Sequence, residues 1–394
     1  MTAHKRFGNK LTRRIARFLF VMLVLHFIVE ASGHHYLYNT LANTVFKGRL
    51  GPGIEEYKGM PNRTVFAGNP EPWPTSTQFG NHSLSAEEEA YHQDFASVSF
   101  VVIHRDSLLF EKYWENFGSD SISNSFSMAK SIVGVLTGIA IEKGLIKSVN
   151  QPVNEFLPQY GEGLGRTLTI KHLLTMSAGI NFDENYINPF AFPAKANYGD
   201  NLELLLTNYE VVDAPGKYFD YQSGATQILS EIVAKAGKDQ LANLATDWLW
   251  KEIGAEHEAL WSLDREDGEE KAFCCFNATA KDFARVGKLY KDFGNWNGKQ
   301  LLDTSYVYEA TTYTNLLETD GTPCKRYSYS WWLGEHKGMS FFFMRGIKGQ
   351  YVMVVPEKDL ILVRMGRKRD NGKNWPHPDD VFNYLDMALK MIEE

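Results

Sequence analysis

The chain places a serine and a lysine at a spacing that suits nucleophilic catalysis. Ser127 and Lys130 precede an apolar run, 132–141, that ends at Lys143-Gly144, a pattern that predicts a buried helix with Ser127 in its first turn. Residues three apart share a helix face, so the amine can take the serine proton if burial lowers the lysine pKa. A capping serine followed by a solvated lysine is the alternative. The apolar neighbours of Lys130 favour catalysis, because a lysine is seldom buried without a task.

A second stretch offers an acid/base group. Tyr221 and Ser223 stand in the segment 219–223, between the turn 214–217 and a helix expected over 225–235. A tyrosine near a lysine cation can ionise and carry protons between a nucleophile and a leaving group. The alternative for Tyr221 is a packed aromatic ring whose hydroxyl bonds a backbone carbonyl.

A third stretch, 339–355, predicts two strands around Gly346 and Gly349. Glycine at such a position lets a backbone lie close to a ligand and present an N–H group to it. An ordinary hairpin is the alternative.

In this order the three stretches resemble the S-x-x-K, Y-x-N/S and K-T-G-like elements of the serine β-lactamase and penicillin-recognising superfamily. The resemblance begins near residue 95 and is nearest to a class C-like branch that contains 6-aminohexanoate-dimer hydrolase (nylon oligomer hydrolase) and related esterases. It implies an α+β fold of the β-lactamase/transpeptidase type. In that fold the N- and C-terminal segments form an antiparallel sheet flanked by helices, with a mainly helical lobe inserted at about 145–320. Further segments that resemble this branch are 168–179, 278–287, 294–302 and 327–332.

The resemblance also implies roles for individual residues. Ser127 is similar to the acylated nucleophile, Lys130 to its proton acceptor and Tyr221 to the acid/base. The oxyanion hole would use the N–H groups of Ser127 and Ile347, if the K-T-G element aligns on 344–346. Aligning it on 347–349 would move the second N–H by three residues. The substrate-binding residues implied are Tyr186, Ser223, Gly346 and Lys348.

One departure from the penicillin-binding pattern bears on the substrate. The cation that opens K-T-G in β-lactam enzymes is replaced here by Met344. Arg345 or Lys348 could substitute, but side chains alternate along a strand, so at most some of these charges point into the cleft. We therefore expect a serine hydrolase that acts through an acyl-enzyme on small linear amides or esters. The alternatives are a β-lactamase or D-alanyl carboxypeptidase-like enzyme, and a non-catalytic binding or scaffold protein of the same fold.

Composition limits the partners. The 394 residues carry a net charge of −7 with mixed signs, which argues against nucleic acid as the principal partner and leaves a small-molecule substrate. The three cysteines have neither a zinc-type spacing nor a paired framework. We expect no metal, no cofactor and no required disulfide, with the neighbouring Cys274 and Cys275 packed near the core. The oligomeric state stays open.

The N-terminal part differs from the rest. Basic residues precede the apolar stretch 18–29, a pattern of a signal sequence or an uncleaved membrane anchor, so segment 1–32 predicts export to the periplasmic or extracellular side. A helix lying on the membrane or on the body is the alternative. Segment 33–94 is rich in Gly, Pro, Asn and Thr and predicts an extended arm or linker. The catalytic domain is expected over 95–394.

Overall fold

The fold is organised around a six-stranded antiparallel sheet, and the computed structural model describes residues 2–49, 51–370, 372 and 377–393. Strands from both ends of the chain share this sheet, with Leu362 opposite Val102 at the seam. The α+β architecture predicted from the sequence is therefore confirmed. In spatial order the strands are β3 (Ser107–Tyr113), β2 (Ser97–His104), β12 (Leu360–Gly366), β11 (Gln350–Val355), β10 (Met339–Gly346) and β9 (Trp332–His336).

Helices cover both faces of the sheet. Helix α10 (Ala280–Lys291) brings Gly287 close to Val352, whereas Tyr384 of α12 (Asp379–Glu393) packs its ring against Tyr351. Because successive side chains of a strand point to opposite faces, these helices lie on opposite sides of β11. Both faces of the sheet are therefore shielded from solvent at β11, which explains why every residue of this strand is buried.

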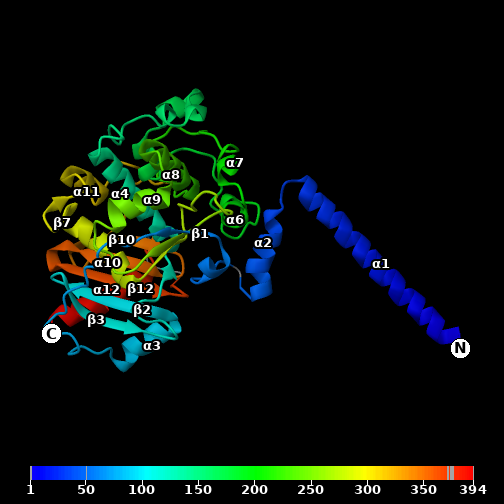
Figure 1. Cartoon of the computed structure of the whole chain (residues 1–394), viewed down its shortest axis with the longest axis horizontal. Coiled ribbons are helices and arrows are strands. Elements are labelled where there is room, and N and C mark those ends of the chain that lie inside the picture. The colour runs from blue at the N-terminus through cyan, green and yellow to red at the C-terminus, as the bar shows by residue number, and fades with distance from the viewer. Residues whose placement is uncertain (1, 50, 371, 373–376, 394) are drawn as a thin grey trace.

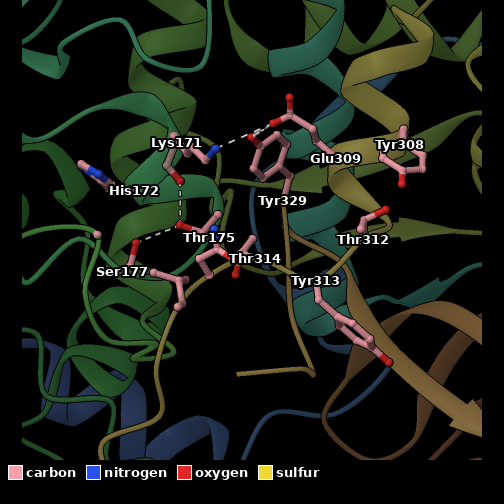
Figure 2. Close-up of a pocket in the computed structure, with 13 residues that line it drawn as sticks. Lys171, His172, Thr175, Ser177, Tyr308, Glu309, Thr312, Tyr313, Thr314 and Tyr329 are labelled. Atoms are coloured by element: carbon pink, nitrogen blue, oxygen red, sulfur yellow. Dashed lines mark hydrogen bonds and ion pairs between the residues drawn. The ribbon is translucent and has the colours of Figure 1, made fainter. Parts of the chain in front are cut away.

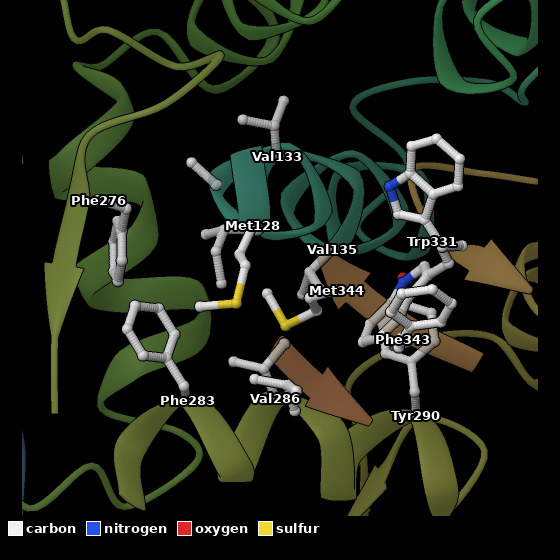
Figure 3. Packing of buried hydrophobic residues seen from close by; sticks show 14 of the residues in the cluster. Met128, Val133, Val135, Phe276, Phe283, Val286, Tyr290, Trp331, Phe343 and Met344 are labelled. Carbon is white, nitrogen blue, oxygen red and sulfur yellow. The ribbon is translucent and has the colours of Figure 1, made fainter. Parts of the chain in front are cut away.

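The helical lobe meets the sheet at α4 (Ala129–Glu142) and the helix that packs on it, α8 (Ser223–Gly237). Helix α4 is buried from Ala129 to Ala140, as an apolar run on all sides requires. Figure 3 shows Met128 and Met344 side by side in the core between α4, the sheet and α10. This packing fixes the start of α4 against β10.

The rest of the lobe consists of short elements, and it also holds strands that the sequence did not predict. A second, four-stranded sheet has the order β1-β5-β6-β4 and joins the segment near residue 62 to the lobe. The further elements are β1 (Asn62–Val65), β4 (Ser123–Asn124), α5 (Ile170–Leu174), α6 (Phe192–Tyr198), α7 (Leu202–Leu206), α9 (Leu241–Ala245), β5 (Ala259–Ser262), β6 (Phe276–Ala278), β7 (Asn295–Trp296), β8 (Lys299–Gln300) and α11 (Thr304–Ala310).

The segment expected as an extended arm contains helices. Helix α2 (Tyr36–Asn43) and the 3-10 turn η1 (Val45–Lys47) lie against the body, and α3 (Ala86–Asp94) starts at Ser85 with a capping box. Buried Tyr36 anchors α2, a tertiary contact that the Gly- and Pro-rich composition did not reveal. We call residues 33–62, which run from the end of the first helix to β1, the N-terminal arm.

Helix α1 (Thr2–Ala31) projects away from the body in Figure 1, with its apolar side chains between Phe18 and Ile28 exposed. Among the described residues, no single helix has the length and apolarity to cross a membrane. The segments Thr12–Ala31 and Tyr36–Lys47, bent by 117° relative to each other, meet that test only as a pair.

Candidate active site

Ser127 lies where the sheet meets the helical lobe. It occupies the 3-10 turn η3 (Phe126–Met128) that leads into α4, so the expected first helical turn is a 3-10 turn. A Cβ atom on Gly346 would come within 2.3 Å of the Ser125 carbonyl oxygen, so only glycine lets β10 approach this turn. Phe126 has a φ of 44°, a left-handed conformation of the kind that recurs at functional sites.

Lys130 is buried behind Ser127, with 1% of its surface exposed. Its Nζ atom lies 3.2 Å from Ser127 Oγ, 3.1 Å from Ser223 Oγ and 2.8 Å from the Phe273 carbonyl oxygen. These three oxygens match the three N–H groups of an ammonium. The charged lysine is therefore fully satisfied despite its burial.

The same contacts also orient the neutral amine. A carbonyl oxygen can only accept a hydrogen bond, and the Ser223 hydroxyl donates its proton to Glu184 Oε1 at 2.5 Å. Both oxygens must then receive N–H groups from Lys130, which uses the two N–H groups that a neutral amine has. The remaining lone pair faces Ser127 Oγ, where it can accept the hydroxyl proton.

Glu184 completes this arrangement from the loop between α5 and α6. Its Oε2 accepts the Ser223 backbone N–H at 2.8 Å, and its Oε1 accepts the Tyr186 hydroxyl at 2.6 Å in addition to Ser223. Three donors converge on one carboxyl group, the pattern that an ionised carboxylate favours. Sequence reasoning did not find Glu184, although it stands two residues before Tyr186.

Tyr221 lies on the other side of the lysine. The centre of its ring is 5.1 Å from Lys130 Nζ, and the ring packs against Trp332 and Tyr327 at 5.3 and 5.9 Å between centroids. Tyr221 stands two residues before α8, which begins at Ser223, so one turn delivers both side chains to Lys130. The structure thus brings together the serine, the lysine and the tyrosine that the sequence singled out.

A cavity of about 320 Å³ opens onto this group. Four of the residues proposed from the sequence line this cavity, namely Ser127, Ser223, Tyr186 and Ile347. Lys130 is buried and Tyr221 is partly buried, and neither of them is in the lining. Gly346 and Lys348, also proposed as substrate-binding residues, are not in the lining.

Gly346 and Lys348 have other contacts. Gly346 permits the close approach of β10 to the Ser125 carbonyl described above, and the Lys348 carbonyl oxygen accepts a hydrogen bond from Arg364 at 3.1 Å. Lys348 is half-buried, and burial lowers the pKa of its amine. Both residues therefore support the segment that carries Ile347.

The residue at the position of the K-T-G cation is the uncharged Met344. Met344 is buried in the core, away from the cavity. The next residue, Arg345, places its guanidinium carbon 3.4 Å from the centre of the Trp332 ring, which in turn packs on Tyr221. Burial lowers the pKa of Arg345 to about 10. This arginine is a cation on the Tyr221 side of the site, outside the cavity lining.

The cysteine prediction needs a correction. Cys274 and Cys275 form a disulfide bond, whereas the sequence predicted no required disulfide and two thiols packed near the core. Neighbouring Cα atoms are closer, at 3.8 Å, than those of most disulfides, so adjacency alone argued against a bond. A left-handed Cys275, with a φ of 68°, provides the necessary turn. Both residues are buried, as predicted, and Cys274 lines the cavity that holds Ser127 directly after Phe273.

A second cavity, of about 300 Å³, lies elsewhere in the helical lobe and contains none of these groups. Figure 2 shows that polar side chains of this cavity pair with one another. Lys171 forms an ion pair with Glu309 at 3.8 Å, and the hydroxyl groups of Thr175 and Ser177 are hydrogen-bonded at 2.8 Å. It offers no nucleophile with an adjacent base. Across the described part of the chain, no group of three or more His, Cys, Asp or Glu side chains is placed to hold a metal ion.

Known proteins are similar to this chain in sequence and in structure. It is 26% identical over 308 residues to the 6-aminohexanoate-dimer hydrolase of Paenarthrobacter ureafaciens, covering 73% of this chain and 75% of that one. A Bacillus anthracis protein provisionally named 6-aminohexanoate-dimer hydrolase superposes with a TM-score of 0.68 at 19% identity, covering 90% and 94% of the two chains. A family VIII carboxylesterase gives a TM-score of 0.62 at 15% identity, covering 81% and 98%.

The solved structures have the same fold as this chain, and the sequence match shows the family to which it belongs. The family described as Beta-lactamase matches residues 84–380, well over half of the 394 residues. That range contains Ser127, Lys130 and Tyr221. The chain belongs to the beta-lactamase family and is a hydrolase of that family.

Proposed function

We propose that this protein is a serine hydrolase that cleaves small linear amides or esters through an acyl-enzyme on Ser127. The observation that carries the proposal is the environment of Lys130. Ser223 Oγ and the Phe273 carbonyl oxygen accept hydrogen bonds from its N–H groups. The lone pair of the neutral amine then faces Ser127 Oγ, 3.2 Å away.

Acylation begins when Lys130 Nζ takes the Ser127 proton and Oγ attacks the substrate carbonyl carbon. The carbonyl oxygen becomes an oxyanion, which the backbone N–H groups of Ser127 and Ile347 would stabilise from the cavity wall. Tyr221 gives its phenol proton to the leaving amine or alcohol as the bond to the leaving group breaks, and Lys130 returns the proton it took from Ser127 to Tyr221, so both groups are restored. Water then attacks the acyl-enzyme by the reverse proton route and releases the acid.

The cavity supports linear amides and esters over β-lactams. The position that opens K-T-G is the buried Met344, and Arg345 stacks on Trp332 outside the lining, so the described residues of the cavity wall include no cation for an antibiotic carboxylate. This agrees with the names of the relatives, an amide hydrolase and an esterase.

We also propose that the N-terminal segment 1–32 exports the catalytic body, as a signal sequence or as a membrane anchor. The basic residues before Phe18 and the exposed apolar side chains that follow support this proposal.

A covalent label tests the acyl-enzyme. A fluorophosphonate should modify the purified full-length protein once, and Ser127→Ala should abolish labelling and lower kcat on p-nitrophenyl butyrate by several orders of magnitude. Ser148→Ala, a serine beyond the far end of α4, is the matched control and should behave as wild type. Labelling that survives Ser127→Ala would overturn the proposal. Rapid nitrocefin turnover without ester cleavage would make the protein a β-lactamase instead.

A further inference from the structure

One wall of the catalytic cavity comes from the N-terminal arm. Thr40, Leu41, Thr44 and Val45 of α2 and its following turn, with Pro52 farther along, line the cavity that holds Ser127. All of them precede residue 84, where the match to the family begins. The size and character of this cavity therefore depend on a segment outside the matched domain.

The arm is held in place by contacts with the opposite wall. Tyr36 donates its hydroxyl to the Pro189 carbonyl at 3.0 Å, and Asn39 donates its side-chain amide to the Tyr198 carbonyl at 3.1 Å. Pro189 and Tyr198 both line the cavity. The arm is thus hydrogen-bonded to two other residues of the lining, and it forms a defined surface for a substrate.

The cavity provides no charge to a ligand. Among the described residues that line it there is no Asp, Glu, Lys, Arg or His. Lys130 and Glu184 reach Ser127 and Ser223 from behind the wall, and their hydrogen bonds are already used. A carboxylate or ammonium group placed against this wall would lose part of its hydration and would meet neutral groups with no opposite charge, which is unfavourable.

Apolar side chains stand at the mouth of the cavity instead. Leu41 of α2 and Val45 after it are 44% and 56% exposed, and Ile187 on the facing loop is 93% exposed. Covering exposed apolar surface beside a binding site with an apolar ligand group lowers the free energy of the complex. The exposure of these three residues is explained if a substrate group lies between the arm and the loop.

We propose that the arm and the facing loop form a specificity subsite for an uncharged apolar group of the substrate, an alkyl or aryl chain that extends from the bond cleaved at Ser127. The proposal rests on the proposed function, because it names the substrate class of the same site. Leu41 and Val45 select the chain, and they contribute nothing to the chemical step.

Two substrate series test the subsite in the full-length protein. In the first, p-nitrophenyl acetate, butyrate and octanoate vary the acyl group. In the second, ethyl and octyl butyrate vary the alcohol. We expect kcat/KM to rise at least tenfold with chain length in one series, and mono-p-nitrophenyl succinate, which carries a carboxylate, to react at least tenfold more slowly than the butyrate. Equal kcat/KM across both series would overturn the proposal.

Paired variants locate the effect on the arm. Leu41→Asp should remove the preference for the long chain, lowering the ratio of kcat/KM for the favoured long substrate to kcat/KM for acetate at least tenfold. Phe46→Asp is the matched control, since Phe46 is 81% exposed on the same arm and does not line the cavity. It should keep the preference. If Leu41→Asp and Phe46→Asp behave alike, the arm does not form the subsite.

The two proposals fail in different ways. Absence of fluorophosphonate labelling and of turnover in every substrate would refute the serine hydrolase. Normal labelling of Ser127 together with a flat chain-length profile would refute the subsite alone.

Discussion

Glu184 fixes the direction of the hydrogen bond between Ser223 and Lys130. Its Oε1 accepts the Ser223 hydroxyl proton at 2.5 Å, so the Ser223 oxygen faces Lys130 Nζ, 3.1 Å away, as an acceptor. Without that carboxylate, Ser223 could turn and donate its proton to the lysine lone pair. The lone pair would then be unavailable to Ser127, and the base would be blocked by a neighbouring residue.

Glu184→Gln tests this relationship. The amide has one acceptor oxygen in place of a carboxylate, and it cannot hold Ser223 and Tyr186 as firmly. We expect kcat on p-nitrophenyl butyrate to fall about 10- to 100-fold with KM changed less than threefold, within the range of a misoriented base. Glu210→Gln, an exposed carboxylate of the same lobe, serves as the control. A kcat within twofold of wild type for Glu184→Gln would show that Ser223 keeps its orientation without the charge.

Tyr221→Phe separates the phenol from its ring. The ring of phenylalanine can keep the contacts with Trp332 and Tyr327, so the thermal midpoint should fall by no more than about 1 °C, the shift that a loss of about 1 kcal/mol gives in a chain of this size. Loss of the acid/base group should lower kcat about 10²- to 10⁴-fold. Stopped-flow detection of p-nitrophenol would place the loss in the acylation step.

A second tyrosine of the lobe provides the control for Tyr221→Phe. Tyr209→Phe, an aromatic residue of the same lobe outside the cavity lining, should retain full activity. Undiminished acylation in Tyr221→Phe would assign the proton transfer to another group.

The parts of this site that could be predicted were local in sequence. Ser127 and Lys130 meet because three residues along a helix give one face, and Gly346 allows close approach because it lacks a Cβ. In the same way, the stretch 339–355 predicted two strands around Gly346 and Gly349, and these are β10 and β11. Each of these signals is contained in a few neighbouring residues.

The parts that could not be predicted depend on contacts between distant segments. Glu184 is 39 residues from Ser223, and the Phe273 carbonyl that orients Lys130 is 143 residues away and has no side-chain signature at all. The arm that closes the cavity has a composition typical of a linker, and only the seating of Tyr36 on the body gives it a fixed place. Tertiary packing, rather than residue type, supplied these groups.

The Cys274–Cys275 disulfide leads to a prediction about redox state. The bond holds the backbone that follows Phe273, whose carbonyl accepts a hydrogen bond from Lys130 at 2.8 Å. Two equivalents of a thiol reductant would convert the disulfide to two thiols and release Cys275 from its left-handed turn. We expect kcat to fall several-fold as the Phe273 carbonyl loses its alignment.

Activity measured with thiol counting checks this prediction. A Cys274→Ser/Cys275→Ser double variant should show the lower kcat without reductant and should not respond to it. Cys324→Ser, which removes the buried free cysteine, should respond as wild type does. Full activity at complete reduction would mean that packing alone positions Phe273.

Buried His92 predicts how stability depends on pH. Its ring stacks on Trp114 with centroids 4.6 Å apart, its Nδ1 lies 2.9 Å from Ser97 Oγ, and burial, reinforced by the charge of Arg364, lowers its pKa to about 3. In the unfolded chain a histidine has a pKa near 6.5. Between these values the unfolded state binds more protons, so the free energy of unfolding falls as the pH decreases below 6.5.

His92→Phe should weaken this dependence, because a phenyl ring can stack on Trp114 and has no proton to bind. One histidine contributes about 1.4 kcal/mol per pH unit in this window, so the loss of unfolding free energy between pH 7 and pH 5 should be roughly 2 kcal/mol smaller in the variant. Urea unfolding at the two pH values measures the difference, with exposed His35→Phe as the control. Equal losses in wild type and His92→Phe would mean that His92 is protonated in the folded protein, and the acid sensitivity would then have to come from other groups such as buried His377, whose pKa is also lowered to about 3 by burial.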